Sequence, residues 1–149
     1  MNLKYFDVAF EEANKAFLED EVPIGAVIVK DDKVLAIAHN QKEKDCCCTS
    51  HAEILAIQKA SKIIKNWRLE NCDMYVTLDP CPMCASAIKQ ARIKNVFSSL
   101  NNNDFSNLEL IEKIFQCDSV NPEVHFQSNY RVDQSKELLK MFFDKQRNS

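Results

Sequence analysis

The amino-acid sequence predicts an α/β protein built on a layered sheet. Segments with the periodicity of amphipathic helices alternate along the chain with short apolar runs that are typical of strands. The length of 149 residues fits one domain with a hydrophobic core, and a hydrophobic content of 46% and a charged content of 28% are ordinary for a globular protein. We therefore expect one domain over residues 1–149, although alternation alone does not fix the order of the strands.

The N-terminal half contains two predicted helices that flank a predicted hairpin. Apolar residues from Phe6 to Phe17 recur at helical spacing, which predicts a helix over residues 3–18. "PIGAVIVK" is typical of a buried strand, and "KVLAIAH" follows it across Asp31-Asp32, which indicates a hairpin. A polar loop then leads into a helix that we expect over residues 50–64.

The C-terminal half continues the alternation. "DMYVTL" is the third predicted strand, and a short helix is expected to start at Asp79-Pro80, because Asp suits a helix cap and Pro suits the first helical position. "KNVFSS" and "EVHFQS" are the fourth and fifth predicted strands, with a helix over 107–116 between them. The last helix, over 132–147, is expected to bury Leu138, Leu139, Phe142 and Phe143.

Composition excludes several classes of function. Gly25 is the only glycine, which excludes a Gly-rich phosphate loop. A net charge of −3 gives no overall attraction to nucleic acid, so RNA binding would need a local basic patch. An odd number of cysteines, seven, argues against a complete disulfide framework and favours the reducing cytoplasm. No signal peptide or membrane span is visible.

A C-x-x-C motif lies where the short helix is expected to begin. Cys81 and Cys84 are spaced i and i+3, which puts both sulfurs on one side of a helical turn. The free N–H groups and the dipole of a helix N-terminus favour the thiolate, which is the form that binds metal. The motif therefore supplies two candidate metal ligands.

His51 is the candidate third ligand, because it lies at the start of another predicted helix. Side chains tilt toward the N-terminus of a helix, so first-turn residues of two helices can reach a shared point. Three protein ligands and one water are typical of a catalytic zinc site, whereas four protein ligands are typical of a structural one. Glu53 can border the same cavity, and we hypothesise that it handles protons on the metal-bound water.

Each motif alone also has a simpler interpretation. Ser50-His51-Ala52-Glu53 matches the capping box S-x-x-E, and a lone C-x-x-C can be a redox pair. Together, H-x-E and P-C-x-x-C each open a helix, thirty residues apart, which favours the metal site. This pair of motifs is the signature of zinc-dependent deaminases.

The sequence resembles the bacterial tRNA-specific adenosine deaminases of the cytidine deaminase superfamily over nearly its whole length. The matching pieces, in the family's order and spacing, are "EVPIGAVIV", Asn40, "HAEILAI", "YVTLDPCPMCASAI", "ARIKNVF" and "FFDKQR". The resemblance implies a three-layer α/β/α fold, with a mixed five-stranded sheet and helices on both faces. It further implies one zinc ion per subunit, a homodimer, and hydrolytic deamination of adenosine to inosine at the wobble position (34) of the tRNA anticodon arm.

The resemblance also implies roles for individual residues. The implied zinc ligands are His51, Cys81 and Cys84, and the implied substrate contacts are Asn40, Ala52, Ile24 and Leu78. Glu53 would take a proton from zinc-bound water and pass it to the ring nitrogen and then to the leaving ammonia. Asn40 would hydrogen-bond the base, the Ala52 backbone would read its edge, and Gly25 would let the backbone approach the pocket closely.

Three segments depart from the family's usual pattern. "SSLNNNDFSN" has no glycine and has Asn102 near the place of an aspartate, Cys47 and Cys48 replace a frequent Asp-Pro, and "LDPC" replaces "LEPC". Two alternatives therefore remain open: a deaminase of a free base or nucleoside (guanine, cytosine or cytidine), or a non-catalytic zinc-binding partner subunit.

RNA binding would need basic side chains on the surface. Candidate phosphate contacts are Lys42, Lys44, Lys62, Lys65, Arg68, Lys89, Arg92 and Lys94.

Overall fold

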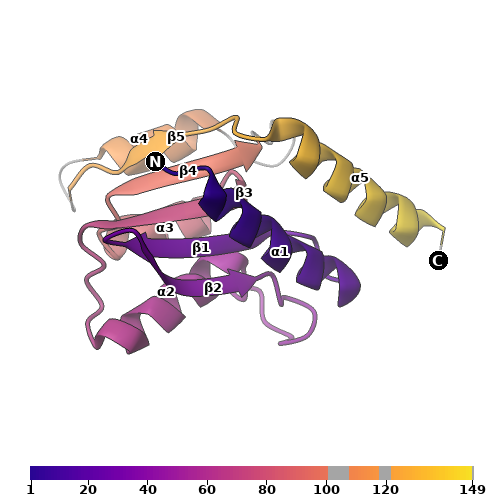
Figure 1. Ribbon diagram of the computed structural model, residues 1–149, viewed down its shortest axis with the longest axis horizontal. Helices are drawn as coiled ribbons and strands as arrows, with labels where there is room; N and C mark the ends of the chain where they lie inside the picture. Colours follow the sequence, from indigo (N-terminus) through magenta and orange to yellow (C-terminus); the bar gives the residue numbers. More distant parts are fainter. Residues whose placement is uncertain (101–107, 118–121, 149) are drawn as a thin grey trace.

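The computed structural model describes residues 1–100, 108–117 and 122–148, and in these ranges it contains five strands and five helices (Figure 1). The strands are β1 (Gly25–Lys30), β2 (Lys33–His39), β3 (Cys72–Leu78), β4 (Asn95–Leu100) and β5 (His125–Gln127). The helices are α1 (Lys4–Leu18), α2 (Ala52–Ile64), α3 (Pro82–Gln90), α4 (Leu108–Gln116) and α5 (Val132–Arg147). The predicted α/β alternation is confirmed.

The strands form one mixed sheet with the order β2-β1-β3-β4-β5. β1 runs antiparallel to both of its neighbours, whereas β3, β4 and β5 run parallel to one another. In this arrangement the start of β1 and the C-terminal ends of β2, β3 and β4 lie side by side at one end of the strands, and this end is one edge of the sheet. The polar connections that follow β2 and β3 therefore leave the sheet side by side.

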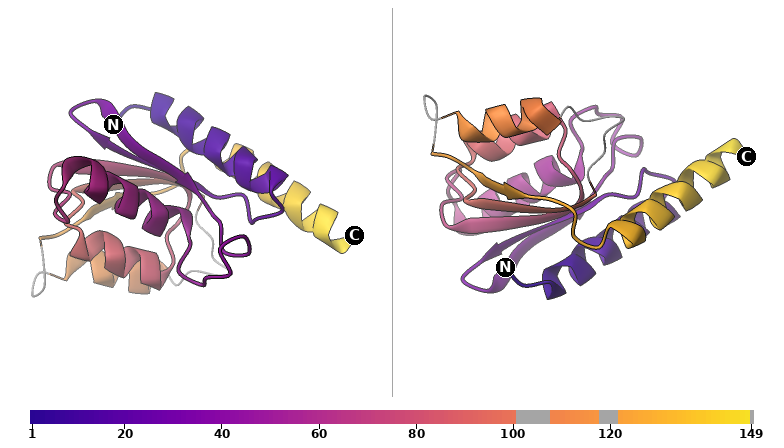
Figure 2. Two further views of the ribbon diagram at one scale, coloured as in Figure 1. Left: turned by 90° about the horizontal axis from the view of Figure 1, so that it is seen from below. Right: turned by 90° about the horizontal axis from the view of Figure 1, so that it is seen from above.

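Helices cover both faces of the sheet, which confirms the three-layer fold. Figure 2 shows α2, α3 and α4 on one side and α1 with α5 on the other. Along β1, Ala26 and Ile28 point into the core under α2, while Val27 and Val29 point into the core under α1. A strand buried on both faces must be apolar throughout, which explains the run "GAVIV".

Three predicted details of the elements are wrong. α3 begins at Pro82 with Cys81 as its cap, and not at Asp79-Pro80, because the Asp79 carboxylate instead accepts a hydrogen bond from the Ser128 hydroxyl. β5 has three residues and not six, because only His125, Phe126 and Gln127 pair with β4. Phe143 is 40% exposed, because α5 packs through Phe142 against α1 and projects past the sheet (Figure 1).

Two further observations bear on earlier expectations. In the described ranges, no helix combines the length and the apolar character that crossing a membrane requires. The departing segment "SSLNNNDFSN" begins inside β4, and its residues 101–107, Asn102 included, lie outside the described part of the chain.

Candidate metal centre and substrate site

Two helix N-termini meet at the edge of the sheet where β2 and β3 end. α2 begins at Ala52 with His51 as its cap residue, and α3 begins at Pro82 with Cys81 as its cap residue. The His51 side chain makes no capping hydrogen bond to α2, and the Cys81 sulfur faces the Cys84 thiol in the first turn of α3. Both are therefore available to bind something else, as the metal hypothesis requires.

The capping-box interpretation of the first motif does not hold. His51, and not Ser50, occupies the cap position of α2, and the Leu55 N–H bonds to the His51 carbonyl at 3.0 Å. Glu53 is thus the second helical residue and lies one position too early to close a capping box. Its burial needs another explanation.

The structure brings together the three residues that were predicted as metal ligands. The Nδ1 atom of His51 lies 3.7 Å from the Cys81 sulfur and 3.5 Å from the Cys84 sulfur. All three ligand atoms lie within 4.8 Å of one another, and no other cluster of three or more metal-binding side chains occurs in the described ranges. The group draws its members from two helices that are separate in sequence.

The spacing of these atoms fits a zinc ion. Tetrahedral zinc, with Zn–S near 2.3 Å and Zn–N of about 2.0–2.1 Å, separates a nitrogen ligand from a sulfur ligand by roughly 3.5–3.6 Å. The two observed nitrogen–sulfur distances, 3.5 and 3.7 Å, match that separation. A set of three protein ligands also leaves one position for water, as in catalytic zinc sites.

The sulfurs of Cys81 and Cys84 share one proton, so the pKa values of the two thiols move in opposite directions. The hydrogen bond from the Cys84 thiol lowers the pKa of Cys81 to about 4, and the same contact raises the pKa of Cys84 far above its usual range. A divalent cation removes the need to share a proton, because it stabilises both thiolates at once.

Glu53 is buried beside the three ligands. It is 4% exposed, and its carboxyl group contacts the Cys84 side chain. Burial raises the pKa of Glu53 to about 7, and the negative charge of Cys81 acts in the same direction. A bound divalent cation would lower the pKa from there. A carboxyl group poised near neutrality can accept a proton and return it, which suits general acid–base chemistry.

The residues predicted to contact the substrate lie at the same edge of the sheet. β1 pairs Gly25 with His39 and Ala26 with Val76, so the residue before Gly25 lies between the ends of β2 and β3. That residue is Ile24, whose carbonyl accepts a hydrogen bond from the Asn40 N–H at 3.1 Å. Leu78 ends β3, and the fully buried Ala52 opens α2 beside His51. Their substrate roles remain predictions.

Gly25 serves a purpose different from the one expected. A Cβ atom at this position would lie 1.9 Å from the Ala9 carbonyl oxygen and 2.7 Å from the Ala13 nitrogen, both in the backbone of α1. The missing side chain therefore lets α1 pack directly on the start of β1. It does not serve the approach of the backbone to a pocket.

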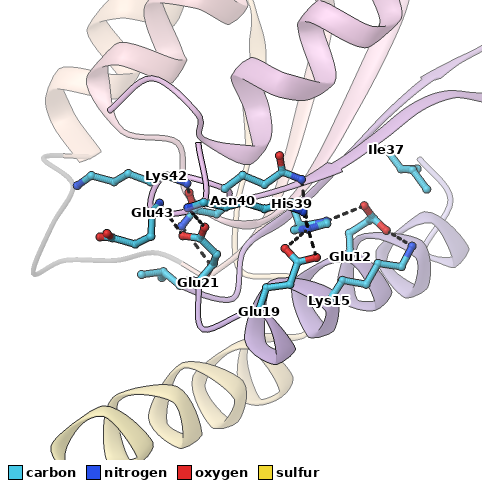
Figure 3. Close-up of polar contacts among 12 residues, drawn as sticks. Glu12, Lys15, Glu19, Glu21, Ile37, His39, Asn40, Lys42 and Glu43 are labelled. Atoms are coloured by element: carbon cyan, nitrogen blue, oxygen red, sulfur yellow. Dashed lines mark hydrogen bonds and ion pairs between the residues drawn. The ribbon is translucent and has the colours of Figure 1, made fainter. Parts of the chain in front are cut away.

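Sequence reasoning missed a buried polar network next to Asn40 (Figure 3). His39 lies between two acidic side chains, with Nδ1 at 3.2 Å from Glu12 and Nε2 at 3.0 Å from Glu19. Burial disfavours the Glu12 carboxylate, but hydrogen bonds from Lys15 and His39 outweigh it and lower the pKa of Glu12. The visible signal was Glu12, an acidic residue on the otherwise apolar face of the first helix.

Glu21 is the second missed residue. It is 1% exposed, and its carboxylate accepts hydrogen bonds from the backbone of the loop that follows Asn40. Its signal in the sequence was a charged residue in the apolar segment that leads into a buried strand, "EVPIG".

One candidate phosphate contact is ruled out. Lys89 is 4% exposed, and its ammonium group donates to the carbonyls of Phe115 and Pro122, at 2.9 and 2.8 Å. This lysine ties α3 to the C-terminal end of α4 and to the chain before β5. It is not available on the surface.

Comparison with known proteins reveals close relatives. A model of the family described as MafB19-like deaminase matches residues 1–147. A tRNA-specific adenosine deaminase of Aquifex aeolicus is 38% identical over 150 residues, which cover 100% of this chain and 99% of that protein.

Solved structures agree with this comparison. A structure from work on A-to-I editing by tRNA A34 deaminases has a TM-score of 0.85 and 34% identity, and the match covers 92% of this chain and 99% of that chain. A guanine deaminase of Bacillus subtilis has a TM-score of 0.67 and 30% identity, with 100% and 96% covered. Both have the fold described above, and the first fits it more closely.

Proposed function

This chain belongs to the family of tRNA-specific adenosine deaminases, and we propose that it hydrolytically deaminates adenosine to inosine at the wobble position of tRNA. The observation that carries the proposal is the meeting of His51, Cys81 and Cys84 around one point, with the buried Glu53 beside them. The family resemblance, the identity over the full chain and the fit to a tRNA A34 deaminase support the choice of substrate.

The proposed chemistry divides between a metal ion and one carboxyl group. His51, Cys81 and Cys84 would hold one zinc ion per subunit, and when bound it supplies Lewis-acid activation of water. Glu53 accepts a proton from the attacking water and delivers it to the ring nitrogen of adenine. It then moves a proton to the departing amino group. A C–O bond forms at C6 and the C–N bond breaks, so adenosine and water give inosine and ammonia.

Other residues would bind and orient the base. Asn40 would hydrogen-bond the base, the backbone of Ala52 would read its edge, and Ile24 and Leu78 would exclude water from the pocket walls. An adenosine in an anticodon loop must leave its stack to reach such a pocket, as for other enzymes that act on bases. We propose the anticodon arm of tRNA as the partner, a homodimer as the assembly, one deaminase domain over residues 1–149, and the cytoplasm as the location.

One assay separates this function from the alternatives. The zinc-loaded protein is incubated with an anticodon stem-loop that carries adenosine at the wobble position and, separately, with adenosine, guanine, cytosine and cytidine; inosine and ammonia are measured. We expect inosine from the stem-loop and no ammonia from the free compounds. Ammonia from guanine alone would instead favour the activity of the second solved relative. No ammonia from any substrate would favour a non-catalytic subunit.

A further inference from the structure

Glu21 has an unusual environment for a carboxylate. It lies in the connection between α1 and β1 and is 1% exposed. One carboxylate oxygen accepts a hydrogen bond from the Glu43 N–H at 3.0 Å, and the other accepts one from the Lys44 N–H at 2.8 Å (Figure 3). Its partners in the described structure are thus two backbone amides of a loop, and hydrogen bonds between a charged group and amides are among the stronger ones.

These amides belong to a single helical turn at the start of the loop between β2 and α2. The turn is closed by a hydrogen bond from the Asp45 N–H to the Gln41 carbonyl at 2.8 Å, and it ends at Cys46, whose φ of 48° is left-handed. An isolated turn is marginal by itself, because its first N–H groups lack partners within the turn. Side chains from outside the turn can supply those partners and hold it in one place.

Two side chains do so. The N–H of Lys42 donates to Asn40 Oδ1 at 3.3 Å, and the next two N–H groups along the chain donate to Glu21. Three successive amides are therefore bonded by Asn40 and Glu21 together. The side chains of residues 42–45 are exposed, so the turn is held through its backbone and not through packing of its own side chains.

The same contacts orient the Asn40 side chain. Its Nδ2 donates to the Val22 carbonyl at 3.4 Å, and its backbone N–H donates to the Ile24 carbonyl at 3.1 Å. Residues 21–24 thus hold the turn through the Glu21 carboxylate and hold Asn40 through two carbonyls. With the turn in place, one lone pair of Asn40 Oδ1 and one proton of Nδ2 remain for a ligand.

The loop also leads to the metal group. It runs from Asn40 to His51, and the Gln41 N–H donates to the Ser50 carbonyl at 3.0 Å, which closes the loop between its two ends. A displacement of the turn would therefore shift the Asn40 side chain first and the start of α2 next.

We propose that Glu21 is a positioning residue of the deaminase: its buried carboxylate fixes the turn after β2 so that Asn40 presents its amide to the substrate base. The inference rests on the proposed function, because it takes from it the contact between Asn40 and the base. Nothing in the chemistry of proton transfer requires Glu21, so its effect passes through Asn40.

Glu21→Gln tests the proposal with the smallest change of shape. The amide keeps one acceptor oxygen, but its NH₂ group then faces a backbone N–H, and one buried donor is left without a partner. We expect kcat/KM on the stem-loop to fall roughly 10- to 100-fold, the scale expected when a positioning group shifts by about 1 Å. Zinc content should not change, and hydrogen exchange should show faster exchange of the amides of residues 42–45.

Glu43→Gln is the matched control. It makes the same change of charge in the turn that Glu21 holds, but its side chain is exposed and its backbone N–H remains. We expect activity and amide protection to match the parent. Glu21→Asp, which keeps the charge and shortens the reach by one carbon, provides a second variant if Glu21→Gln does not fold, and it should lose protection of the same amides.

A double-mutant cycle distinguishes positioning from general stabilisation. If Glu21 acts through Asn40, Glu21→Gln should cost about twofold or less when Asn40 is already alanine, since coupled residues are not additive. An equal loss in both backgrounds would overturn the proposal, as would parental activity in Glu21→Gln despite loss of amide protection.

The outcome for Glu21 is separable from that for the proposed function. The activity of the parent protein on the stem-loop tests the function by itself. The cycle is run on whichever substrate the parent deaminates, and the amide protection of residues 42–45 is measured in every case. Unchanged protection in both Glu21 variants would overturn the positioning role whatever the substrate is.

Discussion

At the scale of single residues, the site depends on two cap positions that do not cap. His51 and Cys81 each precede a helix, yet neither side chain makes a capping hydrogen bond; the two side chains meet each other and Cys84. A helix terminus without a side-chain cap costs about 1 kcal/mol of stability. A histidine and a cysteine at two such positions fit a site in which metal binding offsets that cost.

Glu53 is the residue whose substitution best separates chemistry from metal binding. Glu53→Gln keeps the size of the side chain but can no longer accept a proton, so we expect kcat on the stem-loop to fall about 10²- to 10⁴-fold. Zinc content, measured by mass spectrometry of the purified protein, should stay at one ion per chain.

The control is Glu11→Gln, which removes an exposed carboxylate on α1 and should leave turnover unchanged. Turnover by Glu53→Gln at the parental rate would exclude Glu53 as the acid–base group. Loss of zinc together with activity would instead assign Glu53 a part in holding the metal.

At the scale of the elements, the contact between α1 and β1 determines how closely α1 approaches the sheet. α1 presents small residues to β1, among them Ala9, Ala13 and Ala16, all fully buried. Gly25 opposes them, and its Cα approaches the helix backbone more closely than any side chain would allow. This packing places Glu21 and Ile24, which lie just before β1, against the loop after β2.

Gly25→Ala tests this packing. The added methyl group would meet backbone atoms of α1, which cannot move aside as a flexible side chain can. We expect the free energy of unfolding to fall by about 3 kcal/mol, toward the upper end of the usual cost of overpacking. Chemical denaturation of the zinc-loaded protein measures it, and a loss below about 0.5 kcal/mol would show that α1 shifts without cost.

At the scale of the whole molecule, the metal group joins the starts of two helices that β3 separates in sequence. His51 opens α2 and the two cysteines lie at the start of α3, so one ion would bridge two helices on the same face of the sheet. A ligand that binds only the native state stabilises it by mass action. Metal binding and global stability are therefore expected to be linked.

Removal of metal should consequently lower the melting temperature. At a free zinc concentration about 1,000 times the dissociation constant, binding contributes about 4 kcal/mol, which corresponds to a shift of roughly ten degrees for a chain of this size. Thermal unfolding followed by circular dichroism, with and without a chelator, measures the shift, and added zinc should restore it.

Cys81→Ser provides the comparison for that experiment. This variant lacks one ligand, so the chelator should change its melting temperature far less than it changes that of the parent. An equal shift in both proteins would mean that the chelator acts elsewhere than at this group.

The sequence by itself determined the elements and the identity of the reactive residues. Helix and strand periods are local properties, so residues 33–39 and 132–147 were predicted with the bounds that the structure has. The motifs H-x-E and P-C-x-x-C are also local, so the sequence alone identified His51, Cys81 and Cys84 as candidate ligands. The family resemblance then implied the order of the layers, which local patterns do not contain.

Only the tertiary structure decided how polar groups far apart in sequence are paired. Asp79 was predicted to cap a helix but bonds to Ser128, and Lys89 was predicted on the surface but lies inside, bonded to two carbonyls. Glu21 drew no attention in the sequence, because its partners are amides more than twenty residues away. A backbone N–H has the same chemistry at every residue, so only the folded chain shows which amide a buried carboxylate meets.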